Sequence, residues 1–257
     1  MPDDSSSLPE ARRHARTVDL LGAEGFERLR RSLVVVVGLG GVGSHAAVAL
    51  GRAGVGRLRL VDFDTVSWTS LNRSAFAGSD DVGQPKAIAL TRFLHAIDAT
   101  LEVEPQQLFF HQDTAEQVLG DRPDFVVDAI DSVTPKLALL RACHGRGLPV
   151  VSCMGASART DPLQLRVGDI AETRCCPLAR VVRKELRHHD IHGGILCVYS
   201  VEDARAPLPP DEEEETLRRG RVRRRLPSFS TMPGIFGYTA AGLVIARLSG
   251  LDARRGG

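Results

Sequence analysis

Four consecutive valines run directly into a glycine-rich loop over residues 34–43, and this junction constrains the fold more than any other stretch of the chain. The run VVVVGLGGVG places Gly38, Gly40 and Gly43 in the G-x-G-x-x-G spacing. An unbroken valine run suits a parallel strand that is buried on both faces of a sheet. The small-residue segment that follows predicts a helix from about Gly43, so the junction predicts the first strand–loop–helix unit of a Rossmann-like fold.

Strand-like and helix-like segments alternate along the rest of the chain. Strands are expected at 33–37, 57–64, 101–105, 124–131 and 148–154, with additional strands at 163–167 and 196–201. Helices are expected at 17–32, from about 43, and at 84–97, 134–147, 178–187 and 235–248. This alternation predicts an α/β fold with a doubly wound, mainly parallel sheet, helices on both of its faces and additional C-terminal strands.

The composition is that of an ordinary globular chain. Of the 257 residues, 43% are hydrophobic and 25% are charged, which is usual for a soluble domain. We expect residues 1–15 to form a flexible N-terminal tail and residues 16–257 to form a single domain. Residues 203–227 are Pro-rich, then acidic, then Arg-rich, which predicts a long exposed loop within that domain.

Net charge and cysteine content limit the surroundings in which this chain works. The net charge is +1, so no global field attracts nucleic acid and any basic surface must be local. The five cysteines are an odd number without a regular framework, which favours a reducing cytoplasm. The first residues lack the apolar core of a signal peptide, and the apolar stretch Ile235–Leu248 is too short for a membrane span and contains Arg247. We therefore expect a cytoplasmic protein with no integral membrane segment.

The glycine loop suits either a redox dinucleotide such as NAD or a nucleoside triphosphate. Glycines let the backbone approach phosphate, and the helix start supplies N–H groups and the positive end of a dipole. Asp62 follows Gly43 by 19 residues, as expected of a carboxylate that binds ribose hydroxyls. A tight strand–helix turn would also explain the glycines alone, but the strand, the helix and the acid around them favour nucleotide binding.

The residues after Asp62 favour ATP over NAD. Asn72, Arg73 and Lys86 follow the predicted strand 57–64, and Asp131 ends the predicted strand 124–131, so they lie towards the carboxyl ends where an open sheet binds ligands. Cations neutralise charge on phosphoryl oxygens, and a carboxylate can hold magnesium.

Each of these residues also has a plainer explanation. Arg73 is one of thirty arginines, whereas Lys86 is one of only three lysines and suggests a site that needs a compact charge. Asp131 could cap the helix that is predicted near Thr134, an explanation nearly as good as metal binding when this residue is taken alone.

Four segments in order, GLGGVGS, LVDFDTVSWTSLNR, DVGQPK and VVDAIDSVTPK, resemble the ubiquitin-activating-like adenylyltransferase superfamily. The similarity covers roughly residues 16–200 and the last helix, and an ordered set of motifs is far more specific than any single one. The resemblance implies that ATP and Mg²⁺ bind here, with Asp131 as the metal ligand. It implies that the nucleotide contacts Gly38, Gly40, Gly41, Gly43, Asp62, Asp64, Asn72, Arg73 and Lys86.

The same resemblance implies catalytic roles and partners. The catalytic residues that it implies are Arg16, Arg73, Lys86 and Asp131. Arg16 matches an arginine that in this superfamily reaches into the ATP site of the partner subunit, so a homodimer is implied. A sulfur-transfer or cysteine desulfurase partner is a further implication. Sulfur-carrier activators usually hold zinc with two C-x-x-C pairs, but the adjacent Cys175 and Cys176 cannot give that spacing.

The segment from MGASARTDPLQLRV to LCVYSVED is similar to the tRNA threonylcarbamoyladenosine dehydratase branch of that superfamily. Members of the branch carry a DP-x-x-hydrophobic strand, a PLA-x-x-x-R-x-x-L helix and a V-x-S-x-E strand. The closing segment SFSTMPGIFGYTAAGLVIARLSG also resembles theirs. Two positions depart from the branch, since Cys176 stands where Asp is common and Ser74 stands where Gln is often found.

The branch implies an ATP-dependent dehydratase. ATP would adenylate the free carboxylate of a threonylcarbamoyl group on a tRNA adenosine, releasing pyrophosphate, and the neighbouring carbamoyl group would then close a ring and expel AMP. Because this nucleophile belongs to the substrate, proximity makes an enzyme nucleophile unnecessary. A thioester on Cys176 or Cys197 stays open as the alternative to buried, incidental cysteines.

Other functions stay open on the sequence alone. An adenylyltransferase that activates the C-terminus of a small ubiquitin-like sulfur-carrier protein would show ATP–pyrophosphate exchange stimulated by a carrier that ends in Gly–Gly. A non-catalytic nucleotide-binding scaffold would not need Arg73, Lys86 and Asp131. Six arginines within residues 218–225 can follow the phosphate backbone of tRNA, or form a solvated segment balanced by the acidic run before them.

Overall fold

The computed structural model describes residues 12–206, 208 and 226–251. Within these residues, seven strands form one sheet in the order β3-β2-β1-β4-β5-β7-β6. The strands are β1 (Leu33–Val37), β2 (Arg57–Val61), β3 (Glu102–Gln106), β4 (Phe125–Asp128), β5 (Val150–Cys153), β6 (Leu165–Asp169) and β7 (Leu196–Ser200). All neighbouring strands are parallel except β6 and β7, which pair antiparallel at one edge.

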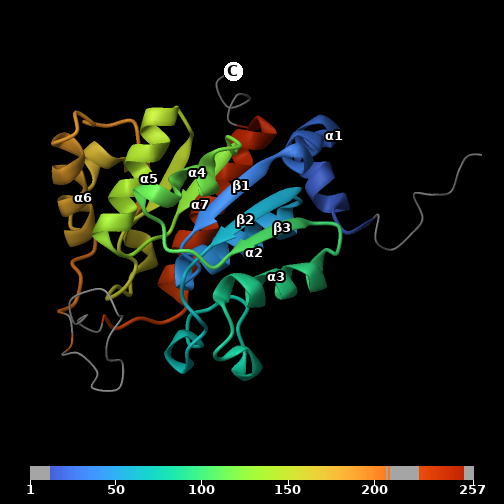
Figure 1. Ribbon diagram of the computed structural model, residues 1–257, viewed down its shortest axis with the longest axis horizontal. Helices are drawn as coiled ribbons and strands as arrows, with labels where there is room; N and C mark the ends of the chain where they lie inside the picture. The colour runs from blue at the N-terminus through green and yellow to red at the C-terminus, as the bar shows by residue number, and fades with distance from the viewer. Residues whose placement is uncertain (1–11, 207, 209–225, 252–257) are drawn as a thin grey trace, which may run out of the picture.

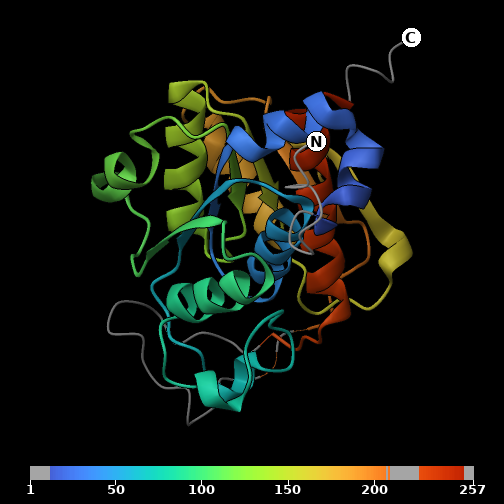
Figure 2. The ribbon, with the colours of Figure 1, turned by 90° about the vertical axis from the view of Figure 1, so that its right-hand side faces the viewer.

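Helices cover both faces of the sheet (Figures 1 and 2). They are α1 (Ala15–Arg31), α2 (Gly41–Ala53), α3 (Lys86–Ile97), α4 (Ala115–Leu119), α5 (Val133–Arg146), α6 (Pro177–Arg187) and α7 (Thr231–Ser249). One face carries α1, α2, α3 and α7, and the other carries α4, α5 and α6. The predicted doubly wound α/β fold is therefore confirmed, including the C-terminal strands β6 and β7.

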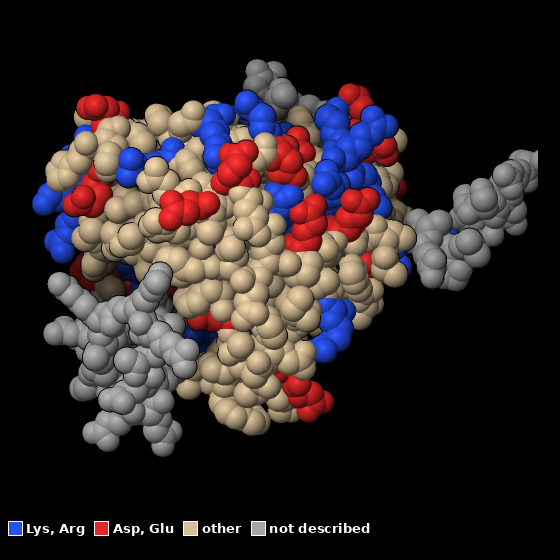
Figure 3. All heavy atoms as spheres, viewed as in Figure 1, with Lys and Arg blue, Asp and Glu red and all other residues tan. Residues whose placement is uncertain are grey.

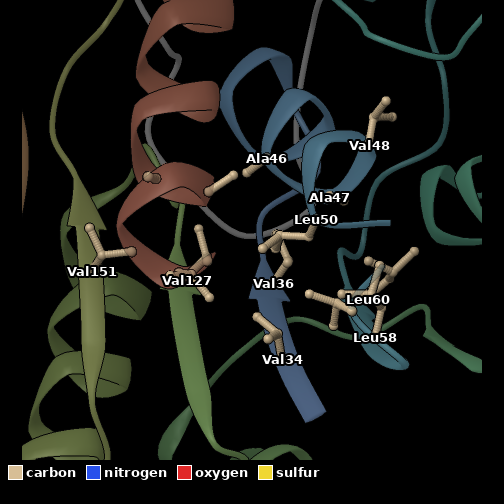
Figure 4. Packing of buried hydrophobic residues seen from close by; sticks show 14 of the residues in the cluster. Val34, Val36, Ala46, Ala47, Val48, Leu50, Leu58, Leu60, Val127 and Val151 are labelled. Carbon is tan, nitrogen blue, oxygen red and sulfur yellow. The ribbon is translucent and has the colours of Figure 1, made fainter. Parts of the chain in front are cut away.

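The valine run explains this two-sided core. All five residues of β1 are buried, and alternate side chains point to opposite faces of the sheet. Val34 and Val36 pack with residues of β2, β4 and α2, as Figure 4 shows. Val35 and Val37 belong to the second cluster, under α4, α5 and α6.

Two of the predicted boundaries that shift in the structure lie next to the glycine loop. The helix α2 begins at Gly41 rather than at Gly43, because Gly40 already serves as its extended N-cap residue. The strand β2 ends at Val61 rather than continuing to residue 64, because the carboxylate of Asp62 turns to accept hydrogen bonds from backbone N–H groups. The short helix α4 was not predicted.

The predicted N-terminal tail and long loop lie largely outside the described residues. Residues 1–11 and 209–225, including the arginines of 218–225, are not described. Just after the first of these segments, Arg13 lies 2.5 Å from Asp98. At the ends of the long loop, the N–H of Arg205 donates to the carbonyl of Ala158, and the N–H of Ala158 donates to the carbonyl of Pro227. None of the described helices is long and apolar enough to cross a membrane.

Candidate functional site

The glycine loop between β1 and α2 uses glycine in three ways. Gly38 has a φ of +89°, and a β-carbon there would lie 2.8 Å from the carbonyl oxygen of Ala129. A β-carbon at Gly43 would lie 1.7 Å from the carbonyl oxygen of Gly38, so only glycine lets α2 pack this closely on β1. At Gly40 a β-carbon would meet nothing within 4 Å. This open space beside the N-terminus of α2 is where a phosphate can approach the backbone.

Asp62 anchors the loop from the next strand. Its side chain accepts the N–H of Leu39 at 2.5 Å and the N–H of Asp64 at 2.8 Å, through different oxygens. The residue is buried, and burial raises the pKa of its carboxyl group, whereas the nearby Lys86 and the two N–H groups favour the charged form. Each oxygen keeps a lone pair for a further donor such as a ribose hydroxyl.

A cleft opens over the glycine loop at the carboxyl ends of the strands. It is lined by Leu39, Gly40, Gly41, Val66, Ser70, Arg73, Ser74, Phe76 and Lys86. The structure therefore brings four of the predicted site residues to one place, although they come from three separate segments of the chain. A β-carbon at Gly41 would lie 2.8 Å from the Pro233 side chain in α7, so glycine at this position lets the starts of α2 and α7 pack closely.

Lys86 is the first residue of α3 and points its ammonium at the cleft margin. Its Nζ lies 3.0 Å from Oδ2 of Asp64, and the two side chains are 13% and 38% exposed. A partly exposed pair of this kind contributes little to stability. The ammonium can therefore exchange the carboxylate of Asp64 for a phosphoryl oxygen.

Asn72 and Arg73 lie together on the loop after β2. The Arg73 guanidinium donates to the carbonyl of Thr69 at 2.6 Å and to Oδ1 of Asn72 at 3.0 Å. The amide of Asn72 donates to the carbonyl of Ser228 at 2.9 Å. Asn72 thus links the cleft residue Arg73 to the end of the long loop, a contact that the sequence did not reveal.

Beneath the turn between β4 and α5 lies a buried polar network. Asp128 ends β4 and accepts the N–H of Ile130 at 3.1 Å through one oxygen. Its other oxygen accepts from Nζ of Lys136 at 2.6 Å and from Oγ of Ser152 at 2.6 Å. Lys136 also donates to the carbonyl of Cys153 at 3.0 Å. Lys136 is not among the predicted site residues, although it is one of only three lysines in the chain and could have been singled out for that reason.

Asp131 is exposed on the same turn, just before α5. The N-cap residue of α5 is Ser132, so Asp131 comes directly before the capping position of this helix. The turn is held at the carboxyl edge of the sheet because the N–H of Ala129 donates to the carbonyl of Val37 at 2.9 Å. An exposed carboxylate here fits Mg²⁺, which takes oxygen ligands from one or two carboxylates together with phosphates and water. Among the described residues there is no cluster of three or more metal-binding side chains.

Arg16 lies at the end of the sheet opposite the cleft, where the parallel strands begin. It is exposed on the first turn of α1, and nearby His14 lies 3.1 Å from Asp98 and packs against the ring of Phe26. Asp98 caps the end of α3, whereas Lys86 begins that helix. Because α3 has 12 residues, roughly 18 Å separates this corner from Lys86. Arg16 is therefore not part of its own chain's cleft.

The DP and V-x-S-x-E segments are joined by hydrogen bonds in both directions between residues 159–161 and Glu202, which we call the clasp. The Glu202 carboxylate accepts the N–H groups of Thr160 and Asp161, both at 2.9 Å. In return, the buried Arg159 donates to the carbonyl of Glu202 and, at 3.1 Å, to that of Cys175. The clasp fixes the turn after β5 against the segment after β7 and the segment before α6.

Neither thiol that was considered for a thioester lines the described cleft. Cys197 is buried in β7, and burial raises the pKa of its thiol. Cys176 is buried as the N-cap residue of α6, where its sulfur accepts the N–H of Ala179 at 3.5 Å.

Comparisons with known proteins show the family to which this chain belongs. The ThiF family model matches residues 12–255. The tRNA threonylcarbamoyladenosine dehydratase of Bacillus subtilis is 37% identical, over 89% of this chain and 91% of that protein. The chain belongs to the ThiF family, and within it the chain is similar to the tRNA threonylcarbamoyladenosine dehydratases.

Two further matches agree with this family. The tRNA threonylcarbamoyladenosine dehydratase 2 of Saccharomyces cerevisiae is 42% identical over 90% of this chain, which spans only 55% of the yeast protein. The crystal structure of the E. coli dehydratase TcdA in complex with ATP has a TM-score of 0.84 and 30% identity, over 96% of this chain and 98% of TcdA. The resemblance that the sequence motifs indicated is confirmed.

Proposed function

We propose that this protein is an ATP-dependent tRNA threonylcarbamoyladenosine dehydratase. One observation carries the proposal: the glycine loop, Arg73 and Lys86 converge on a single cleft at the carboxyl edge of the sheet. The Bacillus subtilis and Saccharomyces cerevisiae relatives described above are named for that activity, and the matching TcdA structure holds ATP.

In the first step, a carboxylate oxygen of the threonyl group attacks the α-phosphorus of ATP, and pyrophosphate leaves. The glycine loop binds the phosphates through N–H groups at the start of α2, and Asp62 accepts the ribose hydroxyls. Lys86 and Arg73 stabilise the negative charge that grows on the phosphoryl oxygens. Asp64 holds Lys86 in the cleft until the nucleotide arrives.

Asp131 is the residue that would hold Mg²⁺. The ion would neutralise charge on the phosphate oxygens. Asp128 and Lys136 act before any ion binds, because they fix the turn that carries Asp131.

In the second step, the carbamoyl group of the same nucleoside attacks the activated carbonyl carbon. The bond from that carbon to the AMP oxygen breaks, the ring closes, and the carbamoyl group loses a proton. The net change in the nucleoside is the loss of one water. No thiol is required, which agrees with the position of Cys176 and Cys197 outside the residues that line the cleft.

We also propose a homodimer in which Arg16 completes the ATP site of the partner subunit. The support is geometric, since Arg16 is exposed at the edge of the sheet opposite its own cleft. We place the reaction in the cytoplasm. A sulfur-transfer or cysteine desulfurase partner stays a prediction, which co-purification with such an enzyme would test.

The decisive experiment is to incubate the protein with ATP, Mg²⁺ and tRNA that carries threonylcarbamoyladenosine. Nucleoside mass spectrometry should show the loss of one water, with formation of AMP and pyrophosphate. Omitting ATP is the control. A sulfur-carrier activator would instead leave the nucleoside intact and exchange pyrophosphate only with a Gly–Gly carrier protein.

Mixing two inactive variants tests the homodimer. Arg16→Ala and Lys86→Ala proteins should each dimerise and turn over poorly. In a heterodimer one of the two sites keeps both groups, so random mixing should restore about a quarter of the normal activity. If heterodimers form and no activity returns, Arg16 does not act across the interface.

A further inference from the structure

The exposed face of α6 carries a row of cations. Arg180, Lys184 and Arg187 are exposed and stand at positions i, i+4 and i+7, so they share one side of the helix. Arg174, just before the helix, is exposed as well. Lys and Arg atoms appear at the left edge of Figure 3, where Figure 1 places α6. The three helical cations extend over about 10 Å.

Within the part of the chain that the structure describes, no ion pair neutralises this row. The only acid in α6 is Glu185, which lies 3.6 Å from His188. On α1, by contrast, Arg28 lies 2.5 Å from Glu24 and Arg31 lies 2.7 Å from Glu27. Like charges four residues apart weaken a helix, so helix stability does not explain the row on α6.

Arg183, the remaining cation of α6, has a different role. It points away from the row, because its guanidinium donates to the carbonyl and the hydroxyl of Thr173 at 2.5 Å. Arg183 therefore holds the segment before the helix in place, whereas the three exposed cations of the row do not hold any described segment.

The row begins near the proposed active site. The first turn of α6 is held at the carboxyl edge of the sheet, since a β-carbon at Gly155, just after β5, would lie 3.5 Å from the sulfur of Cys176. The strand β5 is two places from β1 in the sheet, which corresponds to about 10 Å. From there α6 runs back towards the amino edge, where β7 starts. A long polyanion with one end in the cleft can therefore lie along the helix.

We propose that Arg174, Arg180, Lys184 and Arg187 form a docking surface for the phosphate backbone of the substrate tRNA. This inference rests on the proposed function, because a tRNA whose modified adenosine enters the cleft must extend beyond it. The helix has no aromatic side chain that could stack on bases. The surface therefore contributes affinity that depends on salt and not on base sequence.

The test compares two double variants that lose the same charge. Arg180→Gln/Arg187→Gln removes two cations of the row. The control Arg31→Gln/Arg92→Gln removes two exposed arginines that are already paired, with Glu27 and Asp81. The affinity of each protein for an unmodified tRNA transcript is measured by fluorescence anisotropy over a salt series, with ATP binding and thermal unfolding as checks of the fold.

The α6 variant should bind tRNA about tenfold more weakly near physiological salt, and its slope of log affinity against log salt should fall by about 1 to 2. The control should bind within about twofold of the wild type, because its arginines are paired. Arg180→Lys/Arg187→Lys should keep the wild-type affinity, since phosphate docking needs charge rather than a particular head group. In steady state, the α6 variant should raise KM for tRNA and leave kcat unchanged.

Wild-type affinity and salt slope in the α6 variant would overturn the proposal and leave the row for another partner, such as an acidic protein. Equal weakening in the control would overturn it too, because the effect would then be one of net charge. These results differ from failure of the proposed function, in which the wild-type protein itself would not dehydrate modified tRNA.

Discussion

Two lysine–aspartate pairs in this protein have the same chemistry and opposite surroundings. Lys86 and Asp64 lie 3.0 Å apart at the margin of the cleft, with side chains 13% and 38% exposed. Lys136 and Asp128 lie 2.6 Å apart, and both are completely buried. Breaking the first pair exposes two groups to water or to a nucleotide. Breaking the second leaves a buried charge without a partner, so only the first pair can exchange its partner during a reaction.

The rarity of lysine supports this contrast. The chain has thirty arginines and three lysines, yet lysine occupies both of these positions. An ammonium has three donors on one compact head. In the buried pair these donors reach Asp128, Ser152 and the carbonyl of Cys153. A planar guanidinium would need more space and more acceptors than this network offers.

The largest expected effect is on folding, at the buried pair. Lys136→Met should lower the free energy of unfolding by about 3–5 kcal/mol, because it leaves the Asp128 carboxylate buried without a cation. Lys86→Met should change it by no more than about 1 kcal/mol, since that pair is partly exposed. Urea denaturation of both variants gives the comparison.

A double variant shows whether the uncompensated charge is the cause. Lys136→Met/Asp128→Asn keeps an acceptor for Ile130 but removes the carboxylate charge, so it should be more stable than Lys136→Met alone. If the double variant is less stable than the single one, the pair does not work through charge.

The second expected effect is on catalysis, at the pair in the cleft. Lys86→Ala should lower kcat by about a hundredfold or more, the scale of losing one preorganised electrostatic group, while ATP affinity falls much less. The smaller change in affinity follows because the glycine loop and Asp62 remain. Single-turnover dehydration of modified tRNA, measured beside ATP binding, separates the two. A fully active Lys86→Ala enzyme would contradict the proposed mechanism.

Asp131 should behave like Lys86 in this assay and unlike Asp128. Asp131→Ala should lower kcat by about a hundredfold or more with little loss of stability, because the side chain is exposed. Raising the Mg²⁺ concentration should recover part of the activity if the carboxylate holds the ion. Activity that is insensitive to both the substitution and Mg²⁺ would rule out the metal-binding role.

The two pairs also differ in how far the sequence predicts them. Lys86 follows a predicted strand and begins a predicted helix, and its rarity marks it, so its place in the cleft could be expected. Lys136 lies inside a helix that the sequence predicts correctly, but its partners Asp128 and Ser152 come from β4 and β5. Only the register of those two strands, which pairs Asp128 with Ser152, brings the three groups together. Local patterns carry no information about that register.

The same limit applies to the clasp of Arg159 and Glu202. The DP and V-x-S-x-E motifs were visible in the sequence, but they are about forty residues apart and contain no residue that suggests a contact. Arg16 is the converse case. Its predicted role came from resemblance alone. The structure of one chain shows that the side chain is exposed, but the site that Arg16 is proposed to complete belongs to a partner subunit.

The smallest expected effect is at the cysteines. It tests whether the reaction at the Lys86–Asp64 pair proceeds without a thioester. Cys153 lies beside the buried lysine, and burial raises the pKa of its thiol to about 12. Burial likewise raises the pKa of Cys197. Because both pKa values are raised, these thiols stay protonated at pH 7–9, and the thiolate that would form a thioester is scarce.

Cys197→Ala should therefore keep single-turnover dehydration within about threefold of the wild type, an effect that packing changes alone can produce. Cys176→Ala should do the same, because its buried sulfur does not line the cleft. Alkylation by iodoacetamide in the folded protein should be slow at both positions across pH 7–9 and fast after unfolding. A Cys176→Ala enzyme that folds normally, binds ATP and releases pyrophosphate, yet forms no cyclic product, would show that the acyl group passes through sulfur. In that case the carbamoyl group would attack the thioester rather than the adenylate. Lys86 would then assist only the adenylation of the carboxylate.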